Sequence, residues 1–394
     1  MQFNLDVASF KAAVDAIVPV INKRDTIPIL SNIHVQADAA GLTLTGTDMD
    51  VTRTRRIALA YSPTAGTTTV PAHPLRDLLR SMPKAGRVSG ALEYPDDLTP
   101  IALPLDDRTV HIIPEPKPTG LRLRSGQSNT VLSVTDPADY PLGGKREYTH
   151  AFAVPERAMR LALDKVKQAM STEHTRYYLN GVYLDDTGDS LTFVATDGHR
   201  LCTYALRRPN IKGGSLPPMI LPRKAVNMLT KALSAKGGTV AYIKASDTGL
   251  RVSLGGDTIT TKLVDGTFPD YYRVIPSGND KTLDTPADAL AGAIKRVASI
   301  STDKARAVKL TLNGSVDVSA SSPEHGTASE RIEDARYSDD SELEVGFNSA
   351  YLTDMLRVTS GGHISVQLAD SASPAIINDP GDPQFTGVLM PMRV

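Results

Sequence analysis

The sequence predicts an α+β fold in which one structural unit occurs three times. A short strand followed by an amphipathic helix opens each third of the chain, from Phe3, His150 and Lys281. A hairpin follows each opening, and a second strand and helix come after the hairpin. Alternating residues return at the end of each third. We therefore expect helices to cover one face of antiparallel sheets in each unit.

Chain length and composition also favour several domains. The chain has 394 residues, more than one hydrophobic core usually organises. Pro and Gly cluster near Tyr140–Tyr148 and Pro276–Asp280, as is typical of exposed linkers. The expected domains are residues 1–145, 146–276 and 277–394. The first contains a Pro-rich insertion near 88–119, which we interpret as a surface arm, with a decoration of no function as the simpler alternative.

Helical periodicity identifies the helices in chain order. Met159, Leu163 and Val166, for example, fall on one face of a helix and should pack on a sheet. The same spacing predicts a helix after the strand that starts at Phe3 and five more: in Pro71–Met82, in Pro155–Met170, from Pro222, in Pro286–Ser299 and in Asn348–Val358.

The clearest hairpin lies in the middle of the chain. Two alternating runs, Asn180–Leu184 and Leu191–Ala195, flank Asp and Gly residues that favour a turn. Thr196–Arg200 then forms a polar turn before Leu201–Leu206 returns to strand chemistry. This polar turn carries more hydrogen-bonding side chains than a plain reversal needs, so it is a candidate site.

The charge balance predicts that only local patches of the surface attract nucleic acid. The formal net charge is -1, whereas a protein that binds DNA over its whole surface is usually basic. Basic residues recur on the outer faces of four predicted helices. They are Arg76, Arg80, Arg157, Arg160, Lys167, Arg223, Lys224, Lys231, Lys295 and Arg296. A solvated surface explains any one such helix, but recurrence in a repeated unit favours a positive channel that attracts phosphates without reading bases.

The remaining composition indicates a cytoplasmic protein without cofactor or metal. Cys202 is the only cysteine, which excludes an intrachain disulfide. The N-terminus lacks a signal-peptide pattern, because Lys11 and Asp15 interrupt its apolar residues. No stretch approaches the roughly 20 apolar residues that span a bilayer.

Asp197 and His199 raise the alternative of an enzyme, such as a hydrolase, acting in a cleft. Against it, the sequence shows no ligand-spaced His, Cys or carboxylate nearby, no phosphate-binding loop and no nucleophile elbow. An architectural role is the simpler prediction: Asp197 and Gly198 make the turn, while His199 and Arg200 satisfy backbone groups. A sequence-independent DNA-binding regulator is a further alternative, although no recognition helix is evident.

Several short strings carry a family resemblance. They are TIPILSN from Thr26, RYYLNGV from Arg176, VATDGHRL from Val194, KLVDGTFPDY from Lys262 and MPMRV from Met390. In this order they resemble the bacterial DNA polymerase III beta subunit, the sliding-clamp family, over nearly the whole chain. The resemblance implies three copies of the clamp fold per chain. It also implies a head-to-tail homodimeric ring that encircles duplex DNA and gives the polymerase its processivity.

The resemblance further implies partners and DNA contacts. The expected partners are double-stranded DNA, a second copy of the chain, the polymerase III alpha subunit, the clamp loader and other proteins with clamp-binding motifs. Loop residues Arg24, Arg176, Tyr177 and Tyr178 match DNA-contacting positions of the family. Tyrosine rings can stack on exposed bases, but half-buried strand tyrosines are the alternative interpretation.

A shallow apolar pocket for short partner motifs is implied around the polar turn. The matching positions are Leu179, Thr196, Gly198, His199, Arg200, Leu201, Pro269, Arg273, Val274, Val388, Met390, Pro391, Met392 and Arg393. Leu, Val, Pro and Met make a surface that adapts to different ligands. A closing edge strand is a compatible interpretation of Phe385–Val394. Pro374 departs from the serine that is commoner in the family and could alter the pocket rim.

The resemblance places the joint of the ring between Arg124–Val134 of one copy and Ala298–Ile332 of the other. Many relatives oppose basic and acidic residues there, whereas this chain has Gln127 and Asn129 on the first segment. We therefore expect a joint with weak salt sensitivity that depends on apolar contact. Its expected members also include Leu132, Ser299 and Ile300.

Overall fold

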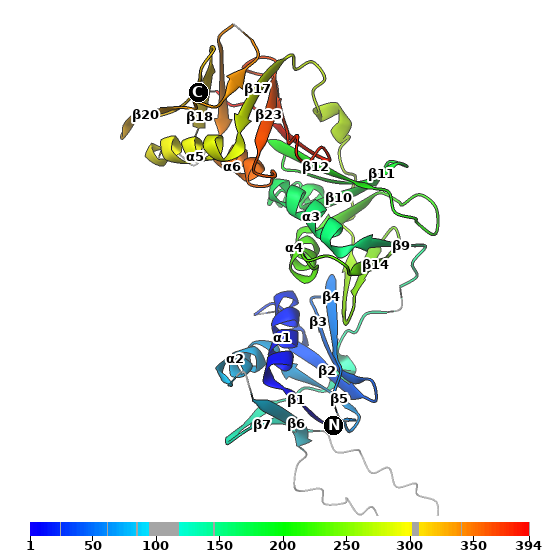
Figure 1. Cartoon of the computed structure of the whole chain (residues 1–394). Coiled ribbons are helices and arrows are strands. Elements are labelled where there is room, and N and C mark those ends of the chain that lie inside the picture. The colour runs from blue at the N-terminus through cyan, green and yellow to red at the C-terminus, as the bar shows by residue number, and fades with distance from the viewer. Residues whose placement is uncertain are drawn as a thin grey trace, which may run out of the picture. The chain divides into compact units, whose positions relative to one another are not determined.

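A computed structural model describes residues 1–23, 25–60, 62–83, 86–93, 118–144, 146–301, 307–339 and 341–393. Arg24 and most of the predicted arm near 88–119 lie outside these residues. The chain divides into two compact units of mixed helices and antiparallel sheets (Figure 1). Unit 1 comprises Met1–Glu147 and Arg251–Thr261, and unit 2 comprises Tyr148–Leu250 and Lys262–Val394.

Unit 1 packs two helices, α1 (Val7–Ile17) and α2 (Ala72–Ser81), against antiparallel strands. The Asp6 side chain accepts a hydrogen bond from the backbone N–H of Ser9 at 2.7 Å and so caps the start of α1. One sheet has the order β1 (Gln2–Asp6), β6 (Arg87–Glu93), β7 (Gly120–Ser125), β8 (Ser128–Ser133). A second runs β5 (Gly66–Pro71), β2 (Asn32–Asp38), β3 (Gly41–Thr47), β4 (Val51–Ile57), β16 (Asp257–Lys262).

The described residues of unit 2 form four helices: α3 (Glu156–Val166), α4 (Arg223–Ala232), α5 (Ala287–Val297) and α6 (Ser349–Leu356). Its nine-stranded sheet has the order β13 (Met219–Pro222), β10 (Gly181–Asp186), β11 (Ser190–Thr196), β12 (Arg200–Arg207), β25 (Phe385–Leu389), β24 (Ala375–Asn378), β23 (His363–Leu368), β17 (Lys281–Pro286), β21 (Arg336–Tyr337).

Further strands lie outside that sheet. β9 (His150–Pro155) pairs with β14 (Val240–Ala245), and β15 (Gly249–Leu254) follows β14 in the chain. A four-stranded sheet has the order β20 (Gly326–Arg331), β19 (Val316–Ser322), β18 (Ala307–Leu312), β22 (Leu343–Asn348). No helix among the described residues is long and apolar enough to cross a membrane.

The predicted elements form, and the helices are slightly shorter than expected. The six predicted helices correspond to α1 through α6, which confirms the helical periodicity. The hairpin is confirmed by antiparallel pairing of β10 with β11, in which Tyr183 lies opposite Val194. The end of the helix predicted in Pro155–Met170 is a 3-10 turn, η4 (Lys167–Ala169). Local patterning therefore identified the elements, with errors confined to their ends.

The second and third predicted domains share one compact unit. Strand β12 pairs with β25, with Cys202 opposite Gly387, so one sheet continues from residues near 200 to residues near 380. Lys165 of α3 also forms a buried ion pair with Asp382 at 2.6 Å. Tyr204 donates a hydrogen bond to the same carboxylate at 3.2 Å. These long-range contacts join segments that the sequence assigned to separate domains.

A second ion pair anchors the loop that follows β12. Arg208 Nε lies 2.5 Å from Asp186 Oδ1, and the backbone N–H of Leu216 donates to Asp186 Oδ2 at 2.9 Å. Hydrogen bonding by Arg208 is the largest cause that lowers the pKa of Asp186 to about 2. The ionised carboxylate therefore stabilises the fold above its ordinary pKa of about 4, and the stabilisation is lost as pH falls through about 2.

We expect Asp186→Asn to lower the free energy of unfolding by about 2 kcal/mol near neutral pH. The difference between the variant and the parent should shrink as pH falls from about 4 to about 2, because the parent carboxylate then becomes protonated. Urea unfolding across this pH range measures the effect. Asp189→Asn, at an exposed position of the same turn, is the control and should change little. A constant difference at every pH would contradict the linkage.

Candidate functional site

A cavity of about 260 Å³ lies in unit 2 beside the polar turn that follows β11. Two 3-10 turns, η5 (Tyr177–Leu179) and η6 (Tyr271–Val274), contribute to its walls. Its lining residues are Arg176, Tyr178, Leu179, Thr196, Gly198, His199, Arg200, Leu201, Pro269, Tyr271, Val274, Val388 and Met390. The cavity therefore collects residues from segments that are far apart in the sequence.

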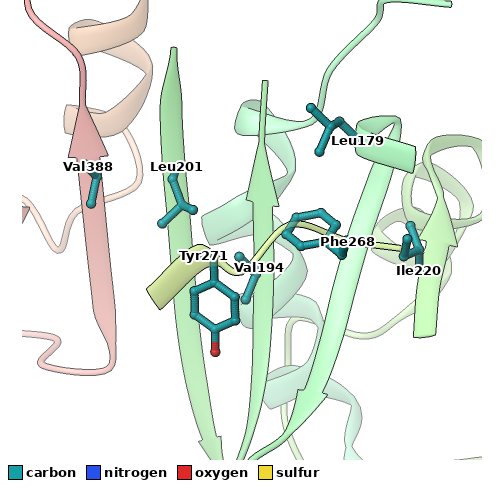
Figure 2. Packing of buried hydrophobic residues seen from close by; sticks show 7 residues of the cluster. All are labelled: Leu179, Val194, Leu201, Ile220, Phe268, Tyr271 and Val388. Atoms are coloured by element: carbon teal, nitrogen blue, oxygen red, sulfur yellow. The ribbon is translucent and has the colours of Figure 1, made fainter. Parts of the chain in front are cut away.

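The floor of the cavity is part of a buried apolar cluster. Leu201 of β12 and Val388 of β25 are register partners, and Figure 2 shows their side chains on these neighbouring strands. The cluster comprises Leu179, Val194, Leu201, Ile220, Phe268, Tyr271 and Val388. A cavity lined mainly by apolar side chains with a few polar groups is the usual form of a binding site.

The structure brings together ten of the fourteen positions that the resemblance assigned to the pocket. Arg273 is outside the lining, and its 86% exposed side chain forms an ion pair with Asp270 at 2.9 Å. The backbone N–H of Met392 donates to the carbonyl of Gly346 at 2.8 Å, which directs this end of the chain toward β22. Pro391 and Arg393 likewise do not line the cavity.

Three lining residues were missed as pocket residues. Arg176 and Tyr178 were expected at DNA, and Tyr271 was not singled out, yet all three contribute to the cavity wall. The signal for Tyr271 is its spacing: side chains three residues apart share a face of a 3-10 turn, so Tyr271 accompanies Val274. Arg176 precedes η5 and Tyr178 is its middle residue, next to Leu179.

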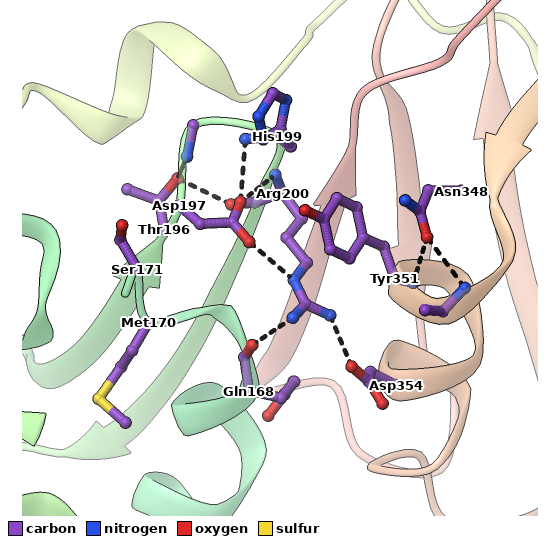
Figure 3. A network of polar contacts seen from close by, with 12 residues as sticks. Gln168, Met170, Ser171, Thr196, Asp197, His199, Arg200, Asn348, Tyr351 and Asp354 are labelled. Carbon is purple, nitrogen blue, oxygen red and sulfur yellow. Dashed lines mark hydrogen bonds and ion pairs between the residues drawn. The ribbon is translucent and has the colours of Figure 1, made fainter. Parts of the chain in front are cut away.

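Hydrogen bonds fix the polar turn at the cavity mouth (Figure 3). Oδ1 of Asp197 accepts the backbone N–H groups of His199 at 2.9 Å and Arg200 at 3.0 Å. Gly198 has φ +88°, and a Cβ there would lie 2.6 Å from the Arg176 guanidinium. A side chain at Gly198 would therefore be strained and would displace a wall residue.

Arg200 connects this turn to two helical segments. Its guanidinium, 8% exposed, binds Asp197 at 3.1 Å, Asp354 of α6 at 3.0 Å and the carbonyl of Gln168 at 2.5 Å (Figure 3). It also lies over the ring of Tyr351, 4.4 Å from the centroid. The prediction that Arg200 satisfies a backbone group is confirmed. His199 differs: its ring stacks on Tyr351 at a centroid distance of 6.1 Å.

Asp197 of the polar turn and Cys202 of the following strand are held within the fold. Both carboxylate oxygens of Asp197 are engaged, one by two backbone N–H groups and the other by Arg200. Cys202 is buried, and burial raises the pKa of its thiol to about 12. Within the described part of the chain, no group of three or more His, Cys, Asp and Glu side chains is arranged to hold a metal ion.

The residues predicted to contact DNA differ in their surroundings. Arg157, Lys231 and Lys295 are exposed, and Tyr177 is exposed on η5. Lys224 is half-exposed and interacts with a neighbouring group. Others are paired with carboxylates. These pairs are Arg76 with Asp77, Arg80 with Asp15, Arg160 and Lys167 with Asp164, Arg176 with Glu173, and Arg296 with Glu330.

Arg223 is a correction to the predicted outward face of α4. Its guanidinium donates to the carbonyl of Met170 at 2.6 Å and also to that of Ser171. Burial lowers the pKa of Arg223, as expected for a cation removed from water. The carbonyls of the segment after η4 need hydrogen-bond donors, and the Arg223 guanidinium supplies them. Arg223 is therefore not a free surface cation.

The residues predicted at the joint lie on one terminal strand, in the turn that precedes it and in one 3-10 turn. Strand β8 ends the four-stranded sheet of unit 1, and β20 ends the four-stranded sheet of unit 2. Gln127 and Asn129 are exposed, and Leu132 is half-buried. Ser299 is exposed and Ile300 half-buried in η7 (Ala298–Ile300). Val131, not singled out from the sequence, is 46% exposed on β8.

Comparison with known proteins identifies the family. Models of the N-terminal, central and C-terminal domains of the DNA polymerase III beta subunit match residues 1–143, 153–270 and 272–393. The chain is 34% identical over 399 residues to the beta sliding clamp of Caulobacter vibrioides and 32% identical over 397 residues to that of Escherichia coli, covering 100% of each chain.

Solved structures give the same result. A sliding clamp of Bartonella birtlesii bound to griselimycin has a TM-score of 0.89 and 34% identity, with 100% of both chains covered. A Pseudomonas aeruginosa clamp bound to griselimycin has a TM-score of 0.89 and 31% identity at the same coverage. The three domain matches, the full-length relatives and the shared fold show that this chain belongs to the beta sliding clamp family, the beta subunits of DNA polymerase III.

Proposed function

We propose that two copies of this chain close head to tail into a ring that encircles duplex DNA and tethers DNA polymerase III and other factors. In this role the protein catalyses no reaction. The observation that carries the proposal is the cavity of unit 2, whose apolar floor is built on β11, β12 and β25. Among the large apolar side chains that are exposed in the described residues, Val274 and Met390 line this cavity. Exposed apolar groups around a cavity indicate a protein-binding site.

The cavity suits a short peptide better than a small polar substrate. Leu179, Leu201 and Val388 supply apolar contact, while Met390 adds a flexible thioether at the rim. Its volume of about 260 Å³ accommodates a few side chains. We infer that partners insert a motif of a Gln followed by paired apolar residues. Partners that share such a motif would compete for one site on each chain.

The unpaired edges of two terminal strands support the proposal of a ring. A terminal strand leaves unpaired backbone donors and acceptors, which a second copy can satisfy. Strands β8 and β20 are terminal strands of different sheets, so pairing β8 of one copy with β20 of the other joins two four-stranded sheets. A heterologous contact of this kind closes after two copies if its rotation allows. The exposed Val131 supplies apolar surface for the contact.

We expect the parent to sediment as a dimer at low micromolar concentration. Val131→Asp should weaken the joint at least about tenfold, because it removes apolar burial and places a carboxylate in the contact. Sedimentation velocity over a dilution series measures the change. Val240→Asp, at an exposed valine of β14, is the matched control and should remain a dimer. A parent that is monomeric throughout would refute the ring.

Sequence-independent attraction of DNA requires cations that are not already neutralised. Arg157 of α3, Lys231 of α4 and Lys295 of α5 are exposed and form no ion pair within the described part of the chain. Helix α6 contributes only Arg357 at its end, and this residue pairs with Asp354 at 3.4 Å. We infer a positive lining that is uneven around the ring, which holds phosphates weakly enough for sliding.

A further inference from the structure

An aromatic surface adjoins the cavity on the side of η6. Tyr271 lines the cavity, and the ring of Tyr272 stacks on it with centroids 4.2 Å apart and planes inclined by 28°. Tyr272 nevertheless remains 58% exposed. An exposed aromatic ring that continues the wall of an apolar cavity extends the surface available to a bound peptide.

A series of rings holds this surface in place. Tyr271 meets Tyr183 edge-on at a centroid distance of 6.5 Å, and Tyr183 stacks on Phe268 at 4.8 Å with nearly parallel planes. Phe268 belongs to the buried cluster below the cavity (Figure 2). Because the series is rooted in the core, the ring of Tyr272 has little freedom left to lose when a ligand covers it.

One carboxylate orients both outer rings. The hydroxyls of Tyr271 and Tyr272 lie 2.8 Å and 3.4 Å from Oδ2 of Asp185 in β10. Burial is the largest cause that raises the pKa of Tyr183. The negative charge of Asp185 raises this pKa further, which indicates a negative potential beside the rings. The face of an aromatic ring attracts cations, and a carboxylate at its edge adds to that attraction.

We propose that Tyr271, Tyr272 and Asp185, here called the aromatic shelf, form an accessory subsite for a basic side chain beside the apolar motif of a partner peptide. The proposal rests on the peptide-binding function of the cavity. The two cation–π contacts within the described residues, Lys165 with Phe385 and Arg200 with Tyr351, do not use the shelf. Because Tyr272 is 58% exposed, its ring can receive a cation from a partner.

Neighbouring charges favour the same ligand. Arg273 follows Tyr272 in the chain, but its guanidinium is bound to Asp270. An acidic side chain on the shelf would approach Asp185, whereas a basic one would pair with it. The shelf therefore discriminates between partners that share the same apolar motif and differ in the charge of one flanking residue.

The test uses peptides with one Gln-plus-apolar motif, each carrying Arg, Ala or Glu at a flanking position on either side. Calorimetry on the parent should show Arg bound roughly two- to fivefold more tightly than Ala on one flank, and Glu more weakly. Tyr272→Ala should abolish this preference while the Ala peptide binds within about twofold of the parent. Tyr272→Phe keeps the ring and should retain most of the preference. Tyr242→Ala, at an exposed tyrosine of β14, is the control.

The outcomes separate the shelf from the cavity. The shelf would be overturned if the peptides bind the parent with no flank preference, or if the Arg preference survives Tyr272→Ala. Either result would leave the cavity function standing. A parent that binds no peptide of the series would overturn both. Loss of the preference in Tyr272→Ala with unchanged binding of the Ala peptide supports the shelf, because a general disruption of the cavity would weaken every peptide equally.

Discussion

Deletion of Met390–Val394 should reduce the affinity of the cavity for a partner peptide by about ten- to a hundredfold. Met390 lines the cavity, and burial of one such side chain contributes about 1.5–3 kcal/mol. The backbone N–H of Met390 also donates to the carbonyl of His199 at 2.9 Å, so the deletion releases the polar turn at the mouth. Calorimetry with a Gln-plus-apolar peptide measures the loss.

A shorter deletion, Arg393–Val394, is the matched control for this experiment. Arg393 is exposed and does not line the cavity, so the shorter chain should bind the peptide within about twofold of the parent. Both deletions should leave the dimer intact, because the tail is distant in sequence from β8 and pairs with β22 rather than β20. Equal affinity of the parent and the longer deletion would show that partners bind elsewhere.

Reversal of Arg157, Lys231 and Lys295 to Glu should strongly weaken association with DNA. The slope of log affinity against log salt becomes shallower by about 0.9 for each phosphate that the protein no longer neutralises, so three such phosphates change it by roughly 2 to 3. These residues are preferable to Arg160 and Arg223, whose guanidinium groups bind the carbonyls of Leu233 and Met170. Binding to a short duplex across a salt series, and retention on nicked circular DNA after loading, measure the effect.

The charge control is a triple reversal at Lys212, Lys236 and Lys244. These lysines are also exposed but lie outside the helix faces assigned to DNA. The control changes net charge by the same amount, so it removes long-range attraction without removing the proposed phosphate-binding side chains. Equal salt slopes for the two triple variants would mean that general charge, and not a helical lining, governs the interaction. Unchanged sedimentation of both variants establishes that the dimer is preserved.

Part of the site was predictable because its residues lie in or near short sequence motifs that resemble the family. Leu179, Leu201 and Val388 were assigned from the family resemblance, and the structure places them in one cavity. The polar turn was also expected, since the spacing of Asp197 and Gly198 after an alternating strand favours a tight reversal. Arg176 and Tyr178 were assigned to DNA, which stays a prediction. Their place in the cavity wall was not predicted, because a short motif gives a residue's neighbours in the chain and not its neighbours in space.

The sequence by itself determined the elements and their faces. Apolar spacing placed the six helices and the central hairpin, because burial of a face imposes a period of 3.6 or 2 residues on the chain. Only the tertiary structure decided which elements meet. Pairing of β12 with β25 brings Leu201 next to Val388, and the carbonyls after η4 draw Arg223 away from the surface of α4. The first contact joins segments nearly two hundred residues apart, and the second depends on backbone carbonyls. Neither leaves a periodic pattern in the sequence.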